Sequence, residues 1–254
     1  MKKVLFTLQV GGYGEDMSKL TIPFMQYHAD KIGAEFRVIK ERRWPELPPV
    51  MEKFQIYHLA QEEFKGYDWF IYWDLDTLIH PDFFDVTALL GKDTTCSGIT
   101  SDFTPNRFKP DPYFLRDGRF IGKGNWCAMF SDWCLDYYHP PEPMTAEHVE
   151  HLAQNIRLTV VESRSGVMQP SHLIDDYCVS RNIARYGLKH TLISEIASKF
   201  NRPDIPNMLF HQYLHDMDKK IVMMQKQLEP PTQTNQNGWG IKIESLNGNG
   251  EVAA

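Results

Sequence analysis

Two aspartates separated by one residue carry the chemistry that is most visible in the sequence. Asp74 and Asp76 directly follow the short apolar run Trp69–Trp73 (WFIYW). Two carboxylates this close repel each other and raise each other's pKa unless a cation lies between them. Hard oxygen ligands suit Mg²⁺ or Mn²⁺, which keep coordination positions open for water and substrate phosphates. A solvated acidic turn is the simpler interpretation, but the apolar strand before the pair favours a cation site.

The segments before the pair indicate which elements position it. The predicted strands are Val4–Val10, Glu35–Ile39 and Trp69–Trp73, and the predicted helices are Pro23–Ile32 and Pro49–Phe64. The strands have apolar or alternating patterns, and Gly33 and Gly66 end the helices. Strands that alternate with helices are typical of a parallel sheet with helices on its faces. Ligands of such sheets bind beyond the carboxyl ends of the strands, where Gln9–Tyr13 and Asp74–Thr77 lie.

The order of elements after Thr77 is less regular. The chain is expected to form helices at Phe83–Leu90, Ala146–Ile156 and Asp175–Tyr186, strands at Thr94–Thr100 and Trp126–Phe130, a short apolar segment at Met208–Phe210, and a loop at Asn106–Gly118. From Gln227 the composition changes to proline, threonine, glutamine, asparagine and glycine, which favours mobility. We predict a folded domain over residues 1–228 and a mobile polar tail over 229–254, with one short strand near Ile241–Ile243.

Composition and charge exclude several classes of protein. The 254 residues are 42% hydrophobic, which indicates a globular protein with a core. A formal net charge of −6 leaves no basic excess for bulk binding to nucleic acid. No apolar run approaches the roughly 20 residues that span a bilayer, and Val4–Leu8 is too short for a signal-peptide core. A cytoplasmic protein is therefore expected, with its four scattered cysteines as free thiols.

The run Lys53–Asp82 (KFQIYHLAQEEFKGYDWFIYWDLDTLIHPD) resembles the core of the GT-A glycosyltransferases, particularly their retaining glycogenin-like and galactosyltransferase-like groups. That family has a helix, then an aromatic-rich strand, then Asp-x-Asp followed by small and aliphatic residues. Leu20–Ile39 also looks like the family's first helix and second strand. The resemblance implies a single GT-A, Rossmann-like α/β domain with a mainly parallel sheet flanked by helices. It also implies transfer of a sugar from a nucleoside-diphosphate sugar, with UDP favoured over GDP.

The resemblance further implies roles for residues at the matching positions. The nucleotide and diphosphate would contact Thr7, Gln9, Gly12, Tyr13, Lys53, Asp74 and Lys219. Mn²⁺ or Mg²⁺ would be held by Asp74, Asp76 and His211. The donor sugar and the acceptor would face Asn125, Asp175 and Asp176. His215 is the second candidate for the third metal ligand, and Lys220 is the alternative to Lys219. The acceptor is left open among a glycan, a lipid, a protein and a modified base.

The same residues also have purely structural interpretations. His211 and His215 are four positions apart, so they could simply cap or pack a helix. Asp175 and Asp176 could be acids of a first helical turn, which the helix dipole favours. Lys53 could be a solvated residue on a helix surface.

A haloacid-dehalogenase-like phosphatase is the main alternative function, because its first motif is also an apolar strand followed by Asp-x-Asp. Asp74 would then be the nucleophile and Asp76 the general acid/base. Asp175 and Asp176 would complete a Mg²⁺ site, with Lys123 as the lysine between the motifs. That motif usually lies on the first strand, whereas here a strand-helix-strand-helix unit precedes it. A sugar- or nucleotide-binding domain without turnover is the second alternative.

Overall fold

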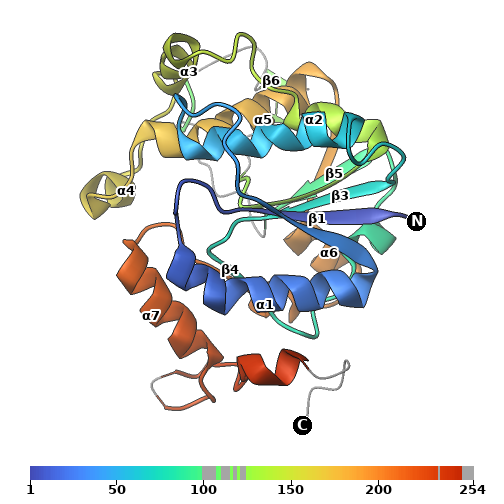
Figure 1. Cartoon of the computed structure of the whole chain (residues 1–254), viewed down its shortest axis with the longest axis vertical. Coiled ribbons are helices and arrows are strands. Elements are labelled where there is room, and N and C mark those ends of the chain that lie inside the picture. The colour runs from blue at the N-terminus through green and yellow to red at the C-terminus, as the bar shows by residue number, and fades with distance from the viewer. Residues whose placement is uncertain (99–106, 110–114, 117–118, 121–123, 234, 248–254) are drawn as a thin grey trace.

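A six-stranded sheet forms the centre of the molecule (Figure 1). The computed structural model describes residues 1–98, 107–109, 115–116, 119–120, 124–233 and 235–247. The strands of the sheet are β1 (Lys3–Leu8), β2 (Ala34–Ile39), β3 (Trp69–Trp73), β5 (Thr94–Ser97), β8 (Cys127–Ser131) and β9 (Lys189–Leu192). Their order is β2-β1-β3-β8-β5-β9. β1 is parallel to β2 and β3, β5 is parallel to β9, and β8 is antiparallel to both of its neighbours. The prediction of a single α/β domain with a mainly parallel sheet is confirmed.

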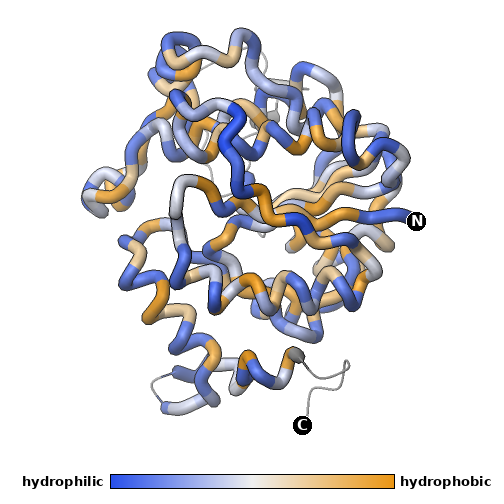
Figure 2. The backbone as a smooth tube through the Cα atoms, viewed as in Figure 1, coloured by the Kyte–Doolittle hydropathy of each residue, from blue (hydrophilic) through white to orange (hydrophobic). Residues whose placement is uncertain are grey.

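Alternating side chains along the central strands build a core on each face of the sheet. Phe70 and Tyr72 of β3 join one apolar cluster, whereas Ile71 and Trp73 join the other. All five side chains of β3 are buried, as expected for a strand that is covered on both faces. Figure 2 shows the result as a hydrophobic band that follows the strands through the middle of the molecule.

Helices cover both faces of this sheet (Figure 1). One face is covered by α1 (Glu15–Ile32) and α6 (Ile193–Lys199), and the other by the 3-10 helix η1 (Pro49–Phe54), α2 (Gln55–Gln61) and α5 (Ile174–Arg185). The described residues also form the α-helices α3 (Ala146–Ala153), α4 (Val160–Ser165) and α7 (Met217–Leu228). Their other 3-10 helices are η2 (Val86–Leu89), η4 (Asp132–Tyr138), η5 (Pro170–Leu173), η6 (Ile205–Met208) and η7 (Ile243–Asn247). Within the described ranges, no helix combines the length and the apolar character that a membrane span requires.

A second, two-stranded sheet begins where the Asp-x-Asp pair ends. It pairs β4 (Thr77–Ile79) antiparallel with β10 (Leu209–His211). The register places His211 opposite Thr77, so a segment from late in the chain lies beside the acidic pair. A short hairpin of β6 (Leu115–Arg116) and β7 (Arg119–Phe120) forms a third sheet.

The first helix is longer than the sequence predicts. It begins at Glu15, and Pro23, the predicted first residue, lies inside it. Proline removes one backbone hydrogen bond from a helix interior. Burial of Met25 in the apolar cluster on the central sheet, and of Phe24 in the cluster shared with α7, offsets that loss. Tertiary packing therefore overrides the local signal for a helix start.

Two other predicted helices are shorter and tighter than expected. The segment Pro49–Phe64 divides into η1 and α2, which ends at Gln61. The segment Phe83–Leu90 keeps only η2, which Asp85 caps by accepting a hydrogen bond from the Thr87 N–H at 3.0 Å. Short elements of this kind leave little periodicity in the sequence. Part of the predicted strand Thr94–Thr100 and most of the predicted loop Asn106–Gly118 lie outside the described residues.

The segment after α7 folds back along α7 and α1. The Trp239 N–H donates to the Gln227 carbonyl of α7 at 2.8 Å. Ile241 and Leu246 are buried in an apolar cluster that includes Phe24 of α1. The strand predicted near Ile241–Ile243 is absent from this part of the described chain, which forms η7 instead.

Candidate active site

The Asp-x-Asp pair lies at the carboxyl end of β3, near the middle of the sheet. Backbone hydrogen bonds hold it on both sides. The Asp74 N–H donates to the Trp126 carbonyl at 2.7 Å, and the Gln212 N–H donates to the Asp76 carbonyl at 3.2 Å. The β10–β4 pairing brings His211 to the same place. Three segments that are far apart in the sequence therefore meet at one end of the sheet, where ligands of parallel sheets bind.

Asp74, Asp76 and His211 offer ligand atoms that all lie within 4.8 Å of one another. His211 Nε2 is 3.3 Å from Asp76 Oδ1 and 3.9 Å from Asp74 Oδ2. Nε2 is buried and makes no hydrogen bond of acceptable geometry with the described residues, although the shorter distance lies within hydrogen-bond range. Two carboxylates and one unengaged imidazole nitrogen can together hold a divalent cation such as Mn²⁺ or Mg²⁺. Of the two predicted histidines, the geometry favours His211 over His215.

Lys220 is the cation that contacts the second aspartate. Its Nζ lies 2.6 Å from Asp76 Oδ2 and 3.4 Å from Tyr13 Oη. Burial disfavours an ionised Asp76, but His211 and Lys220 outweigh burial and lower the pKa of the Asp76 carboxyl. The side chain of Lys219, which the sequence assigned to the diphosphate, is exposed on α7. The structure therefore places Lys220, and not Lys219, at the acidic pair.

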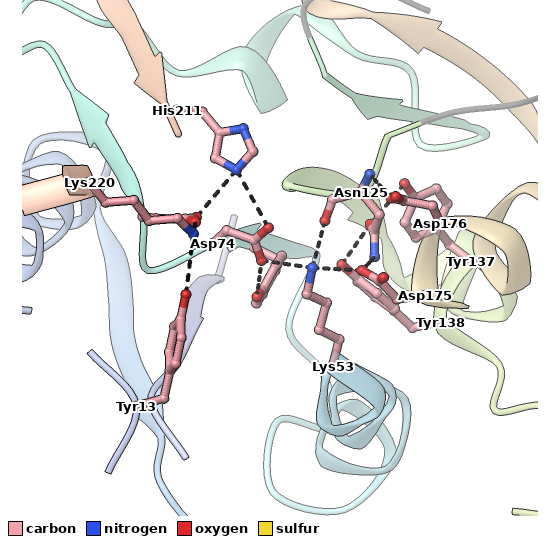
Figure 3. Close-up of polar contacts among 12 residues, drawn as sticks. Tyr13, Lys53, Asp74, Asn125, Tyr137, Tyr138, Asp175, Asp176, His211 and Lys220 are labelled. Carbon is pink, nitrogen blue, oxygen red and sulfur yellow. Dashed lines mark hydrogen bonds and ion pairs between the residues drawn. The ribbon is translucent and has the colours of Figure 1, made fainter. Parts of the chain in front are cut away.

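Lys53 is the buried cation that contacts the first aspartate (Figure 3). Its Nζ lies 2.7 Å from Asp74 Oδ1 and 2.7 Å from Asp175 Oδ2, and it donates to the Asn125 carbonyl at 3.1 Å. Burial opposes the charge of Lys53, but Asp175 and Asp74 outweigh burial and raise its pKa well above the usual value. Burial also raises the pKa of Asp74. Lys53 thus connects Asp74 to Asp175 of α5. Because Lys53 is buried, the simpler interpretation of a solvated residue on a helix surface is wrong.

Asn125, Asp175 and Asp176 form a buried group beside Lys53. The Asn125 N–H donates to Asp176 Oδ1 at 2.6 Å, and its amide nitrogen donates to Asp175 Oδ2 at 3.3 Å. The Tyr138 hydroxyl donates to Asn125 Oδ1 at 2.9 Å. Burial and the neighbouring Asp175 raise the pKa of Asp176 well above its usual value. The structure brings the three predicted residues together, close to Asp74. Their role toward a sugar or an acceptor stays a prediction.

The loop after β1 holds the other residues that the sequence assigned to the nucleotide. Tyr13 is 44% exposed and reaches the site through Lys220, and Gly12 is exposed with a φ of 75°. Gln9 Nε2 donates to Ser18 Oγ at 3.0 Å. Thr7 is the last residue but one of β1 and is fully buried, and its hydroxyl has no hydrogen-bond partner among the described residues. All four assigned residues therefore lie at the carboxyl end of β1 or beyond it, and their contact with a nucleotide stays a prediction.

Two residues that contact the Asp-x-Asp segment itself, Tyr72 and Gly14, were not identified from the sequence. The Tyr72 hydroxyl donates to Asp74 Oδ1 at 2.5 Å. The sequence contains one indication of this contact, because side chains two positions apart along a strand, such as Tyr72 and Asp74, point to the same side. Gly14 has a φ of 70°, and a Cβ there would lie 2.9 Å from Leu75 Cδ2 in the Asp-x-Asp loop. The three glycines at positions 11, 12 and 14 were the indication in the sequence that the backbone makes a tight turn here. Lys123, the lysine of the phosphatase alternative, lies outside the described residues.

Comparison with known proteins gives little beyond this geometry. No protein-family model and no curated protein matches the chain. Among solved structures, the chain is similar to the crystal structure of a glycosyltransferase involved in the glycosylation of the major capsid of PBCV-1. The two are 11% identical with a TM-score of 0.45, and the match covers 87% of this chain and 98% of that chain. A similarity this weak carries no conclusion about function, which must rest on the site.

Proposed function

We propose that the protein is a metal-dependent glycosyltransferase that takes a sugar from a nucleoside-diphosphate sugar, with UDP as the expected nucleotide. The observation that carries the proposal is the Asp74–Asp76–His211 group, whose ligand atoms lie within 4.8 Å at the carboxyl end of the central strand. Its donor set suits Mn²⁺ or Mg²⁺, the ions that bind substrate diphosphates through open coordination positions. The resemblance of Lys53–Asp82 to the GT-A core agrees with this assignment.

Glycosyl transfer breaks the bond between the anomeric carbon and the diphosphate oxygen and forms a bond from that carbon to an acceptor oxygen. The acceptor loses a proton, and negative charge develops on the departing diphosphate. A bound divalent cation would supply the positive charge that stabilises the leaving group. Asp74, Asp76 and His211 would hold that cation. The acceptor stays open among a glycan, a lipid, a protein and a modified base.

The lysines on either side of the acidic pair have different tasks in this proposal. Lys220, on the side of Tyr13, contacts Asp76 directly and would add positive charge near the diphosphate. Lys53 contacts Asp74 from the buried side and also binds Asp175. It therefore orients the first aspartate and supports the site from beneath. Preorganised charges of this kind stabilise a transition state without reorganisation during the reaction.

The proposal is tested with purified protein, a panel of nucleotide sugars, and Mn²⁺ or EDTA. Thermal stabilisation by one nucleotide sugar, with slow hydrolysis of that donor, is expected only when the metal is present. Asp76→Asn is expected to abolish the metal-dependent hydrolysis while the melting temperature without ligand changes little. Its carboxylate lies between Lys220 and His211, so the amide keeps the shape of the side chain but loses a charged ligand.

Two outcomes would contradict this function. Wild-type donor hydrolysis by the Asp76→Asn variant would remove the acidic pair from the mechanism. Hydrolysis of a generic phosphate ester, without a response to any nucleotide sugar, would favour the phosphatase alternative.

A further inference from the structure

The imidazole ring of His211 stacks on two aromatic rings that are nearly parallel to it. Its centroid is 4.8 Å from that of Trp126, with 9° between the ring planes, and 5.8 Å from that of Tyr213, with 8° between the planes. The described rings around the site otherwise meet mostly at tilted or T-shaped angles, as Trp126 and Trp73 do at 50°. Two consecutive stacks on one histidine therefore form a distinct arrangement.

This arrangement replaces a contact that metal-binding histidines ordinarily have. Such a histidine usually donates its second ring N–H to a carboxylate or a carbonyl, and that bond fixes the orientation of the ring. Among the described residues, the second ring nitrogen of His211, Nδ1, has no hydrogen-bond partner, and Nε2 faces only the two carboxylates. Stacking on the two rings opposes rotation of the imidazole out of the plane in which Nε2 faces Asp74 and Asp76.

Trp126 and Tyr213 differ in burial and in the segment of the chain that carries them. Trp126 is 7% exposed, and its carbonyl accepts the Asp74 N–H at 2.7 Å, so this residue is tied to the first aspartate through the backbone. Tyr213 is 42% exposed and lies two residues after His211, beyond the end of β10. The imidazole therefore stacks on one buried ring that belongs to a residue bound to Asp74 and on one ring that is partly open to solvent.

We propose that Trp126 and Tyr213 are positioning residues that clamp His211 for metal binding through ring stacking. The inference rests on the proposed function, because it takes His211 as a ligand of the divalent cation. Neither residue contributes a ligand atom or follows from the acidic motif. Loss of either ring would leave Asp74, Asp76 and His211 in the chain but would weaken the affinity for the cation. Removal of outer-shell partners of metal-binding histidines typically costs about 10- to 100-fold in affinity or activity.

The test measures binding of Mn²⁺ alone, by the electron paramagnetic resonance signal of the free ion. Tyr213→Leu is the main variant, because an exposed position tolerates substitution and leucine keeps apolar bulk without a ring. We expect its Kd for Mn²⁺ to rise about 10-fold. Tyr213→Phe keeps the ring and is expected to restore a Kd within about twofold of the wild type. Trp126→Leu is expected to weaken binding at least as much as Tyr213→Leu.

Trp133→Leu is the matched control. Trp133 is 69% exposed and follows the opposite end of β8 from Trp126, so its loss is expected to leave the Kd unchanged. Thermal unfolding of every variant separates a positional effect from loss of the fold.

His211→Gln distinguishes failure of this inference from failure of the proposed function. If the wild type binds no Mn²⁺, or His211→Gln binds it as well as the wild type, the metal site itself is wrong and the clamp is overturned with it. If His211→Gln weakens binding but Tyr213→Leu and Trp126→Leu do not, the metal site stands and the clamp alone is overturned. If Tyr213→Phe raises the Kd for Mn²⁺ as much as Tyr213→Leu does, the role of the ring is also overturned.

Discussion

Lys219 and Lys220 are neighbours in the sequence, yet only Lys220 reaches the acidic pair. Its Nζ lies 2.6 Å from Asp76, whereas the side chain of Lys219 is exposed. We therefore expect Lys220→Gln to lower kcat/KM for donor hydrolysis by about 100-fold, the usual effect of removing one preorganised group that stabilises developing charge. Lys219→Gln is the matched control and is expected to keep wild-type kinetics. Steady-state assays at saturating Mn²⁺ measure both, and equal losses in the two variants would contradict the assignment.

His28 makes a separate contribution to the pH dependence of stability. It is buried on α1, its ring centroid lies 5.5 Å from that of Phe83, and burial lowers its pKa to about 4. In the unfolded chain a histidine binds a proton near pH 6.5. The unfolded state therefore gains the proton first as the pH falls, and the folded state loses stability between pH 6.5 and about 4. The loss at the lower limit is on the order of 3 kcal/mol.

Urea unfolding of the wild type and of His28→Leu at pH 7.5 and pH 4.5 checks this contribution. Leucine cannot bind the proton, so the variant is expected to lose less free energy of unfolding over this interval, by about 2 kcal/mol. Other groups that titrate in the interval affect both proteins alike and cancel in the difference. The same loss in both proteins would mean that His28 stays neutral in the unfolded state or is protonated in the folded one.

Elements with strong periodicity or burial were predictable from the sequence, and elements fixed by distant contacts were not. The run Trp69–Trp73 indicated a fully buried strand, and β3 has these bounds. The start of α1 was misplaced because Pro23 gave a local signal that tertiary packing overrides. The antiparallel direction of β8 could not be read from its apolar pattern, since the same residues suit either direction.

The residues of the site also divide into those that local sequence identifies and those that only distant contacts bring into place. Asp74 and Asp76 could be identified because their spacing and the strand before them are local properties. His211 required the resemblance, since only the β10–β4 pairing places it beside the acidic pair. The sequence could not decide between Lys219 and Lys220. The packing of α7 on α1 determines which of the two lysines faces the site, and two adjacent lysines carry no local signal of that packing. The stack on Trp126 depends equally on contacts between distant segments.

At the scale of the whole molecule, the segment after α7 determines how far the folded unit extends. Ile241 is 9% exposed in the apolar cluster that contains Phe24 of α1, and Trp239 is hydrogen-bonded to the end of α7. If this segment unfolds together with the sheet, Ile241→Ala removes buried apolar volume from the cooperative unit and is expected to lower the free energy of unfolding by about 2–4 kcal/mol. Val222→Ala on α7, where the side chain is 61% exposed, is expected to change it by less than about 0.5 kcal/mol.

Urea titrations that follow both tryptophan fluorescence and far-UV circular dichroism measure this difference. A single transition with a lower midpoint in Ile241→Ala would make the segment part of the same cooperative unit as α1 and α7. An unchanged midpoint would instead agree with a mobile tail beyond residue 228, because a segment that is already detached cannot alter the stability of the rest. The stability of this segment also affects the candidate active site, because α7 carries Lys220, whose Nζ lies 2.6 Å from Asp76 Oδ2. A segment that stabilises α7 therefore also holds in place the cation on the nucleotide side of the acidic pair.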